Sequence, residues 1–151
     1  FNLFILHACG TVDAKKGYLF VADSGGGKST LARLSSGKTL LNDDRIILRK
    51  RGKHFEIFGT PWPGEAKTVS GQSARIKEIF FLQKAQSNRI LPLDRIKAMR
   101  ILLRNIFYFP LGEQQLRRVF CFCHELTRNL RCYQLRFRPD IGIWEKLEKI
   151  N

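Results

Sequence analysis

The chain has 151 residues, of which 44% are hydrophobic and 26% are charged, and its formal net charge is +14. This length suits one domain with its own hydrophobic core, and twelve phenylalanines argue against a disordered chain. No apolar run approaches the roughly eighteen residues of a membrane-spanning helix, and no secretory signal pattern begins the chain. We therefore expect no membrane partner.

The positive charge is concentrated in the second half of the chain. Residues 67–138 carry fifteen basic and four acidic side chains, whereas residues 1–66 carry ten basic and six acidic ones. Such an excess attracts nucleotides, nucleic acid or an acidic protein surface, although it can equally be a solvated basic face.

Cysteine usage favours a reducing compartment, and we expect a cytoplasmic protein. Four cysteines in a chain of this size do not make the disulfide framework of a small secreted protein. Cys121 and Cys123 stand two residues apart on a predicted helix, so buried free thiols fit better than a zinc site. Because the chain begins at Phe1 without methionine, we interpret residues 1–151 as a single domain with a trimmed N-terminus.

Short apolar runs predict strands, and apolar residues at helical spacing predict helices. In the first half of the chain we expect strands at 1–8 and 18–22 joined by a turn at 14–17, a short helix at 31–34 ended by Gly37, and a strand at 40–41. A hairpin of 46–48 and 54–58 and a loop at 59–65 should follow. In the second half we expect a strand at 76–82, helices at 94–107 and 116–126, a strand at 133–137 and a terminal helix after 139. Asp94 is the expected N-cap of the first long helix. The expected core faces of the two long helices are Ile96, Met99, Leu102, Leu103 and Ile106, and Leu116, Val119, Phe120, Cys123 and Leu126.

A glycine-rich stretch connects the strand at 18–22 to the short helix. Residues 22–29 form the phosphate-loop pattern, with alanine in place of its usual first glycine. Glycines let consecutive backbone N–H groups turn toward an anion, and the helix start adds the positive end of its dipole. An ordinary glycine-rich turn with an exposed lysine is the alternative. The predicted nucleotide-binding residues are Ser24, Gly25, Gly26, Gly27, Lys28, Ser29 and Thr30.

Within this stretch, two side chains have a specific expected role. Lys28 would reach the β- and γ-phosphates, and the Ser29 hydroxyl would bind Mg²⁺. ATP and Mg²⁺ are therefore the expected ligands. The fold that this motif and the predicted elements favour is α/β, with a central β-sheet, the phosphate loop at its carboxyl edge and flanking helices.

Two adjacent carboxylates, Asp43 and Asp44, follow the next apolar strand, fifteen residues beyond Lys28. Because neighbouring parallel strands end at one edge of a sheet, we expect these side chains near the loop. Successive strand residues point to opposite faces, so one carboxylate could hold Mg²⁺ while the other orients a nucleophile. A solvated turn with two acids is the alternative.

Together these residues resemble the HPr kinase/phosphorylase family and its PEP-carboxykinase-like relatives. The resemblance consists of Leu6-His7 on the first strand, the loop at 22–30, and Asn42-Asp43-Asp44-Arg45, and it covers residues 6–65. It implies an ATP-dependent kinase that transfers the γ-phosphate to a serine or other hydroxyl of a peptide or small protein.

The resemblance also implies residue roles. Asp43 accepts the hydroxyl proton, His7 tunes Asp43, Lys28 neutralises phosphate charge, and Ser29 with Asp44 serves the metal or the loop.

Further implications come from the rest of the family. Small HPr-kinase-like proteins often carry a Gly-x-Pro-Trp loop like residues 59–62, which makes Glu65 a candidate metal or substrate contact. Enzymes of this type often assemble, so a homo-oligomer is compatible with the resemblance.

Two other functions stay open. The helix after the loop is short, and the glycine-rich signature that HPr kinases carry after the active loop is not visible. A non-catalytic ATP-binding accessory module of a peptide-modifying or carrier system fits these departures. A basic NTPase acting on nucleic acid fits the charge, but the helical arginines are not interleaved with exposed aromatic side chains, so we do not expect a nucleic-acid partner.

Overall fold

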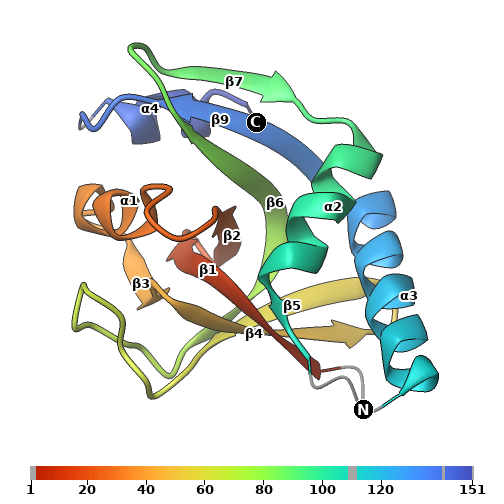
Figure 1. The fold of residues 1–151 in the computed structure, drawn as a ribbon. Helices are drawn as coiled ribbons and strands as arrows, with labels where there is room; N and C mark the ends of the chain where they lie inside the picture. The colour runs from red at the N-terminus through yellow and green to blue at the C-terminus, as the bar shows by residue number, and fades with distance from the viewer. Residues whose placement is uncertain (1–2, 109–111, 141, 151) are drawn as a thin grey trace.

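The computed structural model describes residues 3–108, 112–140 and 142–150. They form a mixed α/β fold, in which a strongly curved sheet is flanked by helices on two sides (Figure 1). The strands are β1 (Leu3–Asp13), β2 (Lys16–Val21), β3 (Thr39–Asn42), β4 (Arg45–Arg51), β5 (His54–Gly59), β6 (Ser73–Lys84), β7 (Arg89–Pro92), β8 (Ile106–Phe107) and β9 (Arg131–Phe137). The helices are α1 (Lys28–Leu34), α2 (Arg95–Asn105), α3 (Glu113–Asn129) and α4 (Ile143–Glu148).

The sheet closes on itself through its longest strand. Its order is β2-β1-β4-β5-β6-β9-β7, and β2 also pairs with β6, so that β2, β1, β4, β5 and β6 form a ring. β3 and β8 each pair with β1 outside this path. A ring leaves few unpaired strand edges, and it fixes the positions of the strand ends relative to one another.

Four strands end at the same edge of the sheet. β2 and β3 are both antiparallel to β1 and so run in one direction, while β6 is parallel to β2 and β9 is parallel to β6. The expected common edge for residues 22–29 and Asp43-Asp44 is therefore present. Its expected cause is wrong, however, because β1 lies between β2 and β3 and they do not pair as parallel neighbours.

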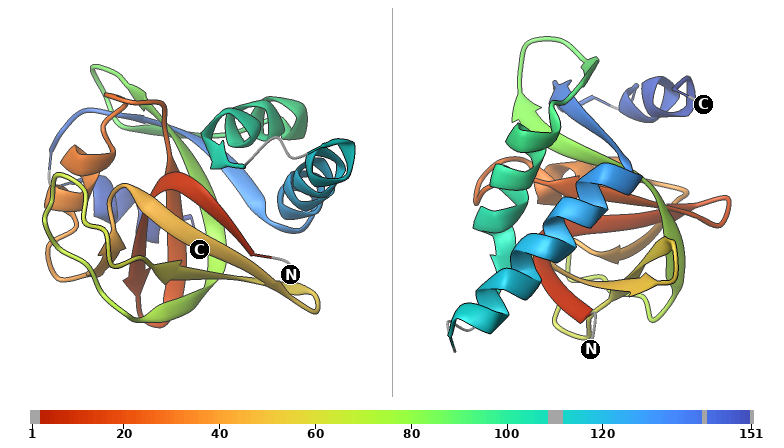
Figure 2. Two further views of the ribbon diagram at one scale, coloured as in Figure 1. Left: turned by 60° about the horizontal axis from the view of Figure 1, so that its bottom comes forward. Right: turned by 90° about the vertical axis from the view of Figure 1, so that its right-hand side faces the viewer.

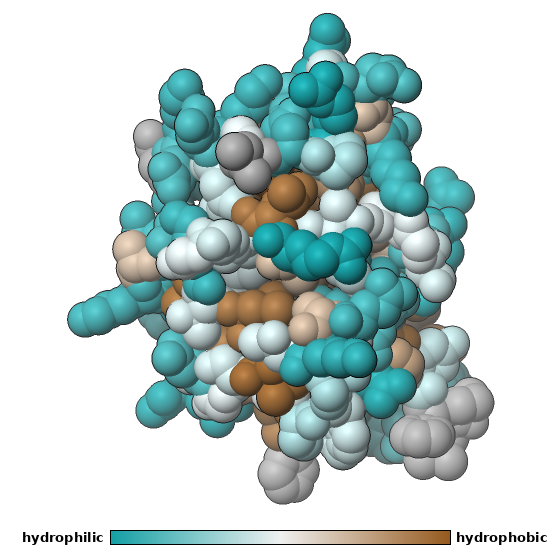
Figure 3. All heavy atoms as spheres, turned by 90° about the vertical axis from the view of Figure 1, so that its left-hand side faces the viewer, coloured by the Kyte–Doolittle hydropathy of each residue, from teal (hydrophilic) through white to brown (hydrophobic). Residues whose placement is uncertain are grey.

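Two hydrophobic clusters cover the two faces of the sheet. The first includes Ala98 and Leu102 of α2 and Val119 and Leu126 of α3, which pack on β1, β4, β5 and β6. Figure 2 shows α2 and α3 lying together along one side of the sheet. The second cluster joins α1 and α4 to aromatic residues of β2 and β6. Trp144 of α4 packs edge-on against Phe20 of β2, which stacks on Phe80 of β6. On the molecular face nearest α1, hydrophobic residues are visible between hydrophilic ones (Figure 3).

Most predicted elements are present, with longer bounds. The β1–β2 hairpin turns through Ala14 and Lys15, whose φ angles of 46° and 65° suit a two-residue turn. Asp94 caps α2 by accepting hydrogen bonds from Ile96 N and Lys97 N. The sequence pattern missed β7 and β8, which are two to four residues long.

The predicted core faces of the long helices are partly wrong. Ile96 is 71% exposed, and Leu116 and Phe120 are exposed as well, while Phe122 and Ala98 are buried instead. The buried face of each helix is narrower than, and shifted from, the predicted apolar stripe, so the outer residues of that stripe face solvent.

The cysteines are free, as expected, but the expected burial of Cys121 is wrong. Cys9, Cys123 and Cys132 are buried and Cys121 is exposed. Burial raises the pKa of Cys123 and of Cys132 to about 12.

In the part of the chain that the structure describes, no helix is long and apolar enough to cross a bilayer.

Candidate functional site

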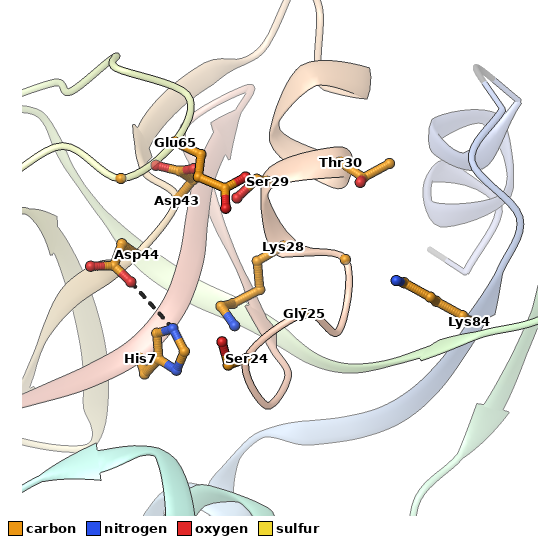
Figure 4. A pocket seen from close by; sticks show the side chains of 12 residues that line it. His7, Ser24, Gly25, Lys28, Ser29, Thr30, Asp43, Asp44, Glu65 and Lys84 are labelled. Carbon is orange, nitrogen blue, oxygen red and sulfur yellow. Dashed lines mark ion pairs between the residues drawn. The ribbon is translucent and has the colours of Figure 1, made fainter.

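A polar pocket of about 480 Å³ opens at the edge where β2, β3 and β6 end (Figure 4). Its lining comes from β1, the β2–α1 loop, the first turn of α1, the turn after β3, the loop after β5 and the end of β6. The lining residues are His7, Ser24, Gly25, Gly27, Lys28, Ser29, Thr30, Asp43, Asp44, Gly64, Glu65 and Lys84. Among the predicted site residues, Gly26 is the one that is not part of this lining.

The glycine loop has a shape that side chains would prevent. Gly27 has a φ of +106°, and a Cβ there would lie 2.5 Å from the ring of Phe137. A Cβ on Gly26 would lie 2.5 Å from the Cβ of Ala22. Ala22 and Gly26 are therefore complementary, because the extra methyl group at the first loop position requires a glycine at the fifth.

Lys28 is the first residue of α1 and is 6% exposed. Its ammonium group donates hydrogen bonds to the carbonyl oxygens of Ala22 (2.7 Å) and Asp23 (3.2 Å). Burial lowers the pKa of Lys28, while the carboxylates of Asp44 and Asp23 oppose that shift. The charge of Lys28 is thus held inside the loop by backbone oxygens, a position from which it can turn to an anion.

Asp43 is buried at the base of the pocket. Its Oδ2 accepts a hydrogen bond from Ala66 N (3.0 Å), while its Oδ1 has no hydrogen-bond partner within the described residues. A Cβ on Gly64 would lie 2.5 Å from this Oδ1, so glycine keeps the space beside it open. A buried carboxylate oxygen without a partner is costly, and a ligand group that binds it would remove that cost.

The turn that carries the two acids is held by Asn42, which is fully buried. Its Oδ1 accepts from Asp44 N (2.7 Å) and Arg45 N (3.0 Å). Its Nδ2 donates to Thr60 O (3.2 Å), Thr60 Oγ1 (3.1 Å) and Trp62 O (2.8 Å). Asn42 therefore joins the acidic turn to the proline-containing loop. The resemblance included this residue, but its role was not anticipated.

His7 contacts the second aspartate and not the first. Its Nε2 lies 3.2 Å from Asp44 Oδ1, and Asp44 also pairs with Arg45. The expected tuning of Asp43 by His7 is thus not a direct contact in this structure. Burial is the main cause that lowers the pKa of His7, and Lys28 lowers it further, against the opposing effect of Asp44.

The end of α2 is connected to the glycine loop, which sequence reasoning missed. Asn105 donates to Asp23 Oδ1 (3.1 Å), and Arg104 lies 2.9 Å from Asp23 Oδ2. Asn105 also acts on His7, whose pKa it raises against the larger lowering by burial. α2 thereby contacts the loop and acts on the His7–Asp44 pair. No local sequence signal predicts a contact between residues 82 positions apart.

Ser29, Asp43 and Glu65 form the oxygen-rich part of the pocket (Figure 4). Among the described residues, no three His, Cys, Asp or Glu side chains lie close enough to hold a metal ion by themselves. A hydroxyl and carboxylate oxygens are nevertheless the donor types that Mg²⁺ takes, and it is commonly bound through one or two carboxylates with nucleotide phosphates. The residues present fit Mg²⁺ brought by a nucleotide.

Lys84 lines the same pocket from the end of β6, and sequence reasoning did not single it out. A lysine at the end of a strand has no motif around it. In Figure 4 its side chain lies on the far side of the glycine loop from Asp43 and Asp44.

No family model matches the sequence, and no curated protein matches it either. The fold does have a counterpart among solved structures, the Hpr(Ser) kinase/phosphatase from Coxiella burnetii. The two structures share 14% sequence identity with a TM-score of 0.54, over 97% of this chain and 87% of that chain. This similarity shows that the two chains share an overall fold.

Proposed function

We propose that residues 1–151 form one nucleotide-binding unit that transfers the γ-phosphate of ATP to a hydroxyl of a peptide or small protein. The observation that supports this most is the common pocket of the glycine loop, Lys28 and Asp43, whose Oδ1 is buried without a partner in the described residues. A phosphate-binding loop beside an available carboxylate is the arrangement that phosphoryl transfer requires. The fold shared with the Hpr(Ser) kinase/phosphatase agrees with it.

In this proposal the loop binds the phosphates through the backbone N–H groups of residues 25 and 27–29, because the Gly26 N–H already donates to Asp23 O (2.9 Å). Lys28 exchanges its hydrogen bonds with Ala22 O and Asp23 O for contacts with the phosphate oxygens. The low-dielectric position of Lys28 strengthens this attraction. Mg²⁺, when bound with ATP, would neutralise part of the phosphate charge, and Ser29 and Glu65 offer oxygen atoms to hold it. Asp44, the third expected ligand, would first have to give up its contacts with His7 and Arg45.

Asp43 Oδ1 accepts the proton of the acceptor hydroxyl as that oxygen attacks the γ-phosphorus, and the bond from the γ-phosphorus to the β–γ bridging oxygen breaks, so that ADP is released. The hydrogen bond from Ala66 N holds the carboxylate in one orientation while this happens. The mainly neutral His7 fixes Asp44 and leaves the charge of the turn negative. Catalysis then consists of positioning, charge neutralisation and one proton transfer.

Nucleotide binding is tested by the melting temperature with and without Mg-ATP. Mg-ATP is expected to raise the melting temperature of the wild type and not that of Lys28→Ala, because only the native state binds the ligand. Lys53→Ala, in the β4–β5 turn, removes one exposed charge elsewhere and should keep the shift. No shift of the wild type with ATP or GTP would contradict the proposal.

Phosphoryl transfer is tested in single-turnover reactions with radiolabelled ATP and a panel of hydroxyl-containing peptides. Asp43→Asn should keep the melting-temperature shift and lower transfer by about 10²–10⁴-fold, the usual contribution of a positioned base. Equal transfer by the variant and the wild type would remove Asp43 from this role.

A non-catalytic ATP-binding accessory module is the second candidate. The observation that favours it is that the described residues contain no ready-made cluster of metal-binding side chains. Binding of Mg-ATP with no transfer to any acceptor would support this candidate over the kinase.

A further inference from the structure

We propose that Lys84 is a second nucleotide-binding cation, which contacts the α-phosphate on the nucleoside side of the glycine loop. The inference rests on the proposed function. It assigns to the pocket a phosphate-binding residue that lies outside the loop motif, on a different strand.

The backbone holds Lys84 at a defined place beside the loop. β6 is parallel to β2 with Phe81 opposite Val21, so three more residues carry β6 along the start of the loop. On its other side Lys84 pairs with Phe137 of β9, whose ring lies where a Cβ on Gly27 would point. The strand that delivers Lys84 and the residue that supports the loop are therefore direct neighbours.

The side chain of Lys84 has no other assigned partner. Within residues 3–108, 112–140 and 142–150, no hydrogen bond or ion pair engages it, whereas Lys28 binds backbone oxygens and Lys38 pairs with Asp13 and Glu148. Figure 4 shows its ammonium group pointing toward the loop at Gly25. An unpaired cation directed at an anion-binding loop is suited to bind part of the same anion.

The charges in the pocket decide which phosphate Lys84 meets. Asp43, Asp44 and Glu65 all lie on the other side of Lys28 from Lys84 (Figure 4). In the proposed function the γ-phosphate lies toward Asp43, which takes the proton. Because the γ-phosphate occupies the end of the pocket that holds the three carboxylates, the rest of the nucleotide extends to the opposite side of Lys28, past Lys84. Lys84 thus meets the part of ATP that is not transferred.

This position predicts an effect on binding common to ATP and ADP. Isothermal titration of the whole chain with Mg-ATP and Mg-ADP should show both weakened about tenfold in Lys84→Gln. Lys84→Arg, which keeps the charge, should stay within about twofold of the wild type. Lys53→Gln removes one exposed positive charge elsewhere and should leave both affinities unchanged. Lys84 is exposed at a strand end, and equal melting temperatures without nucleotide would verify that the variants fold.

Three outcomes would overturn the assignment while the proposed function stands. The first is that Lys84→Gln binds both nucleotides with unchanged affinity. The second is that Lys84→Gln loses affinity for ATP but not for ADP, which would indicate a contact with the γ-phosphate. The third is that Lys53→Gln loses as much affinity as Lys84→Gln, which would indicate a general effect of charge. A wild type that binds neither nucleotide would overturn the proposed function and the Lys84 assignment together.

Discussion

The two walls of the pocket are built by opposite means. The glycine loop at 22–27 takes its shape from missing side chains, because Cβ atoms at Gly26 and Gly27 would each meet another carbon at 2.5 Å. The acidic turn at 42–45 takes its shape from one buried side chain, Asn42, which forms hydrogen bonds on both sides. Added side-chain atoms should therefore disrupt the glycine loop, whereas removal of the Asn42 side chain should disrupt the acidic turn.

The largest effect is expected at Gly27. In Gly27→Ala a side chain at φ +106° meets the Phe137 ring, so we expect a loss of roughly 3 kcal/mol or more of unfolding free energy and loss of ATP binding. Gly25→Ala is the matched control: its φ is +76° but the space around it is empty, so the loss should be about 1 kcal/mol. Urea unfolding measures both. Equal losses would show that steric contact does not shape this wall.

Asn42→Ala tests the acidic wall. It leaves the N–H groups of Asp44 and Arg45 and the carbonyls of Thr60 and Trp62 without their partner, at a cost of about 2–3 kcal/mol. Because the loop wall is intact, transfer should fall more than ATP affinity does. Asn129→Ala, on the exposed end of α3, should change neither. An Asn42→Ala variant that loses affinity and transfer in equal proportion would contradict the separation of the two walls.

The complementarity of Ala22 and Gly26 can be measured by a double-mutant cycle. Gly26→Ala should cost about 2 kcal/mol through the contact with the Ala22 methyl group. In an Ala22→Gly background part of this cost should disappear, giving a coupling energy of about 1 kcal/mol. The carbonyl of Asp23, 2.9 Å from the added Cβ, prevents full recovery. Strictly additive single variants would argue against the pairing.

The smallest effect is expected at Glu78, a buried carboxylate that, unlike Asp43, does not line the pocket. Glu78 of β6 is fully buried, and Arg131 lies 2.9 Å from its Oε1. Burial raises the pKa of Glu78, against the opposing charges of Arg131, Lys77 and Lys16. The folded state therefore binds this proton more tightly than the unfolded state, and stability falls as pH rises between the ordinary pKa and the raised one.

Glu78→Gln should remove this cost. The variant is expected to be more stable than the wild type by about 1 kcal/mol at pH 7.5, and the difference should disappear below the ordinary carboxyl pKa, near pH 4. Urea unfolding at the two pH values measures it, and transfer activity should not change. A variant that is less stable at pH 7.5 would show that the Arg131 pair outweighs burial.

The sequence was informative where function needs contiguous residues. A phosphate loop binds with consecutive backbone N–H groups, so residues 22–29 could be predicted as a unit, and a strand before Asp43 was enough to expect the acids nearby. Contacts across the chain could not be predicted. Asn42 binds Thr60 and Trp62, and Asn105 binds Asp23, because β-strand pairing and helix packing bring these distant residues together.

The same limit explains the errors in the fold. Helical spacing identified α2 and α3 but could not tell which part of each stripe meets the other helix and which part meets solvent, so Ile96 and Phe120 were assigned to the core. The positions of β2 and β3 could be assigned only once the pairing of β1 with each of them was known. Periodicity describes one element at a time, whereas burial depends on its neighbours.

The unequal burial of the thiols gives the protein a ready attachment point for a reporter. Cys121 faces solvent on α3, whereas burial shields the sulfur atoms of Cys9, Cys123 and Cys132. A maleimide dye at neutral pH would therefore attach at a single position without any prior mutagenesis. α3 packs on α2, and Asn105 of α2 donates a hydrogen bond to Asp23 of the glycine loop. A change in the fluorescence of that dye on addition of nucleotide would therefore show that ligand binding in the pocket alters the packing of α2 and α3.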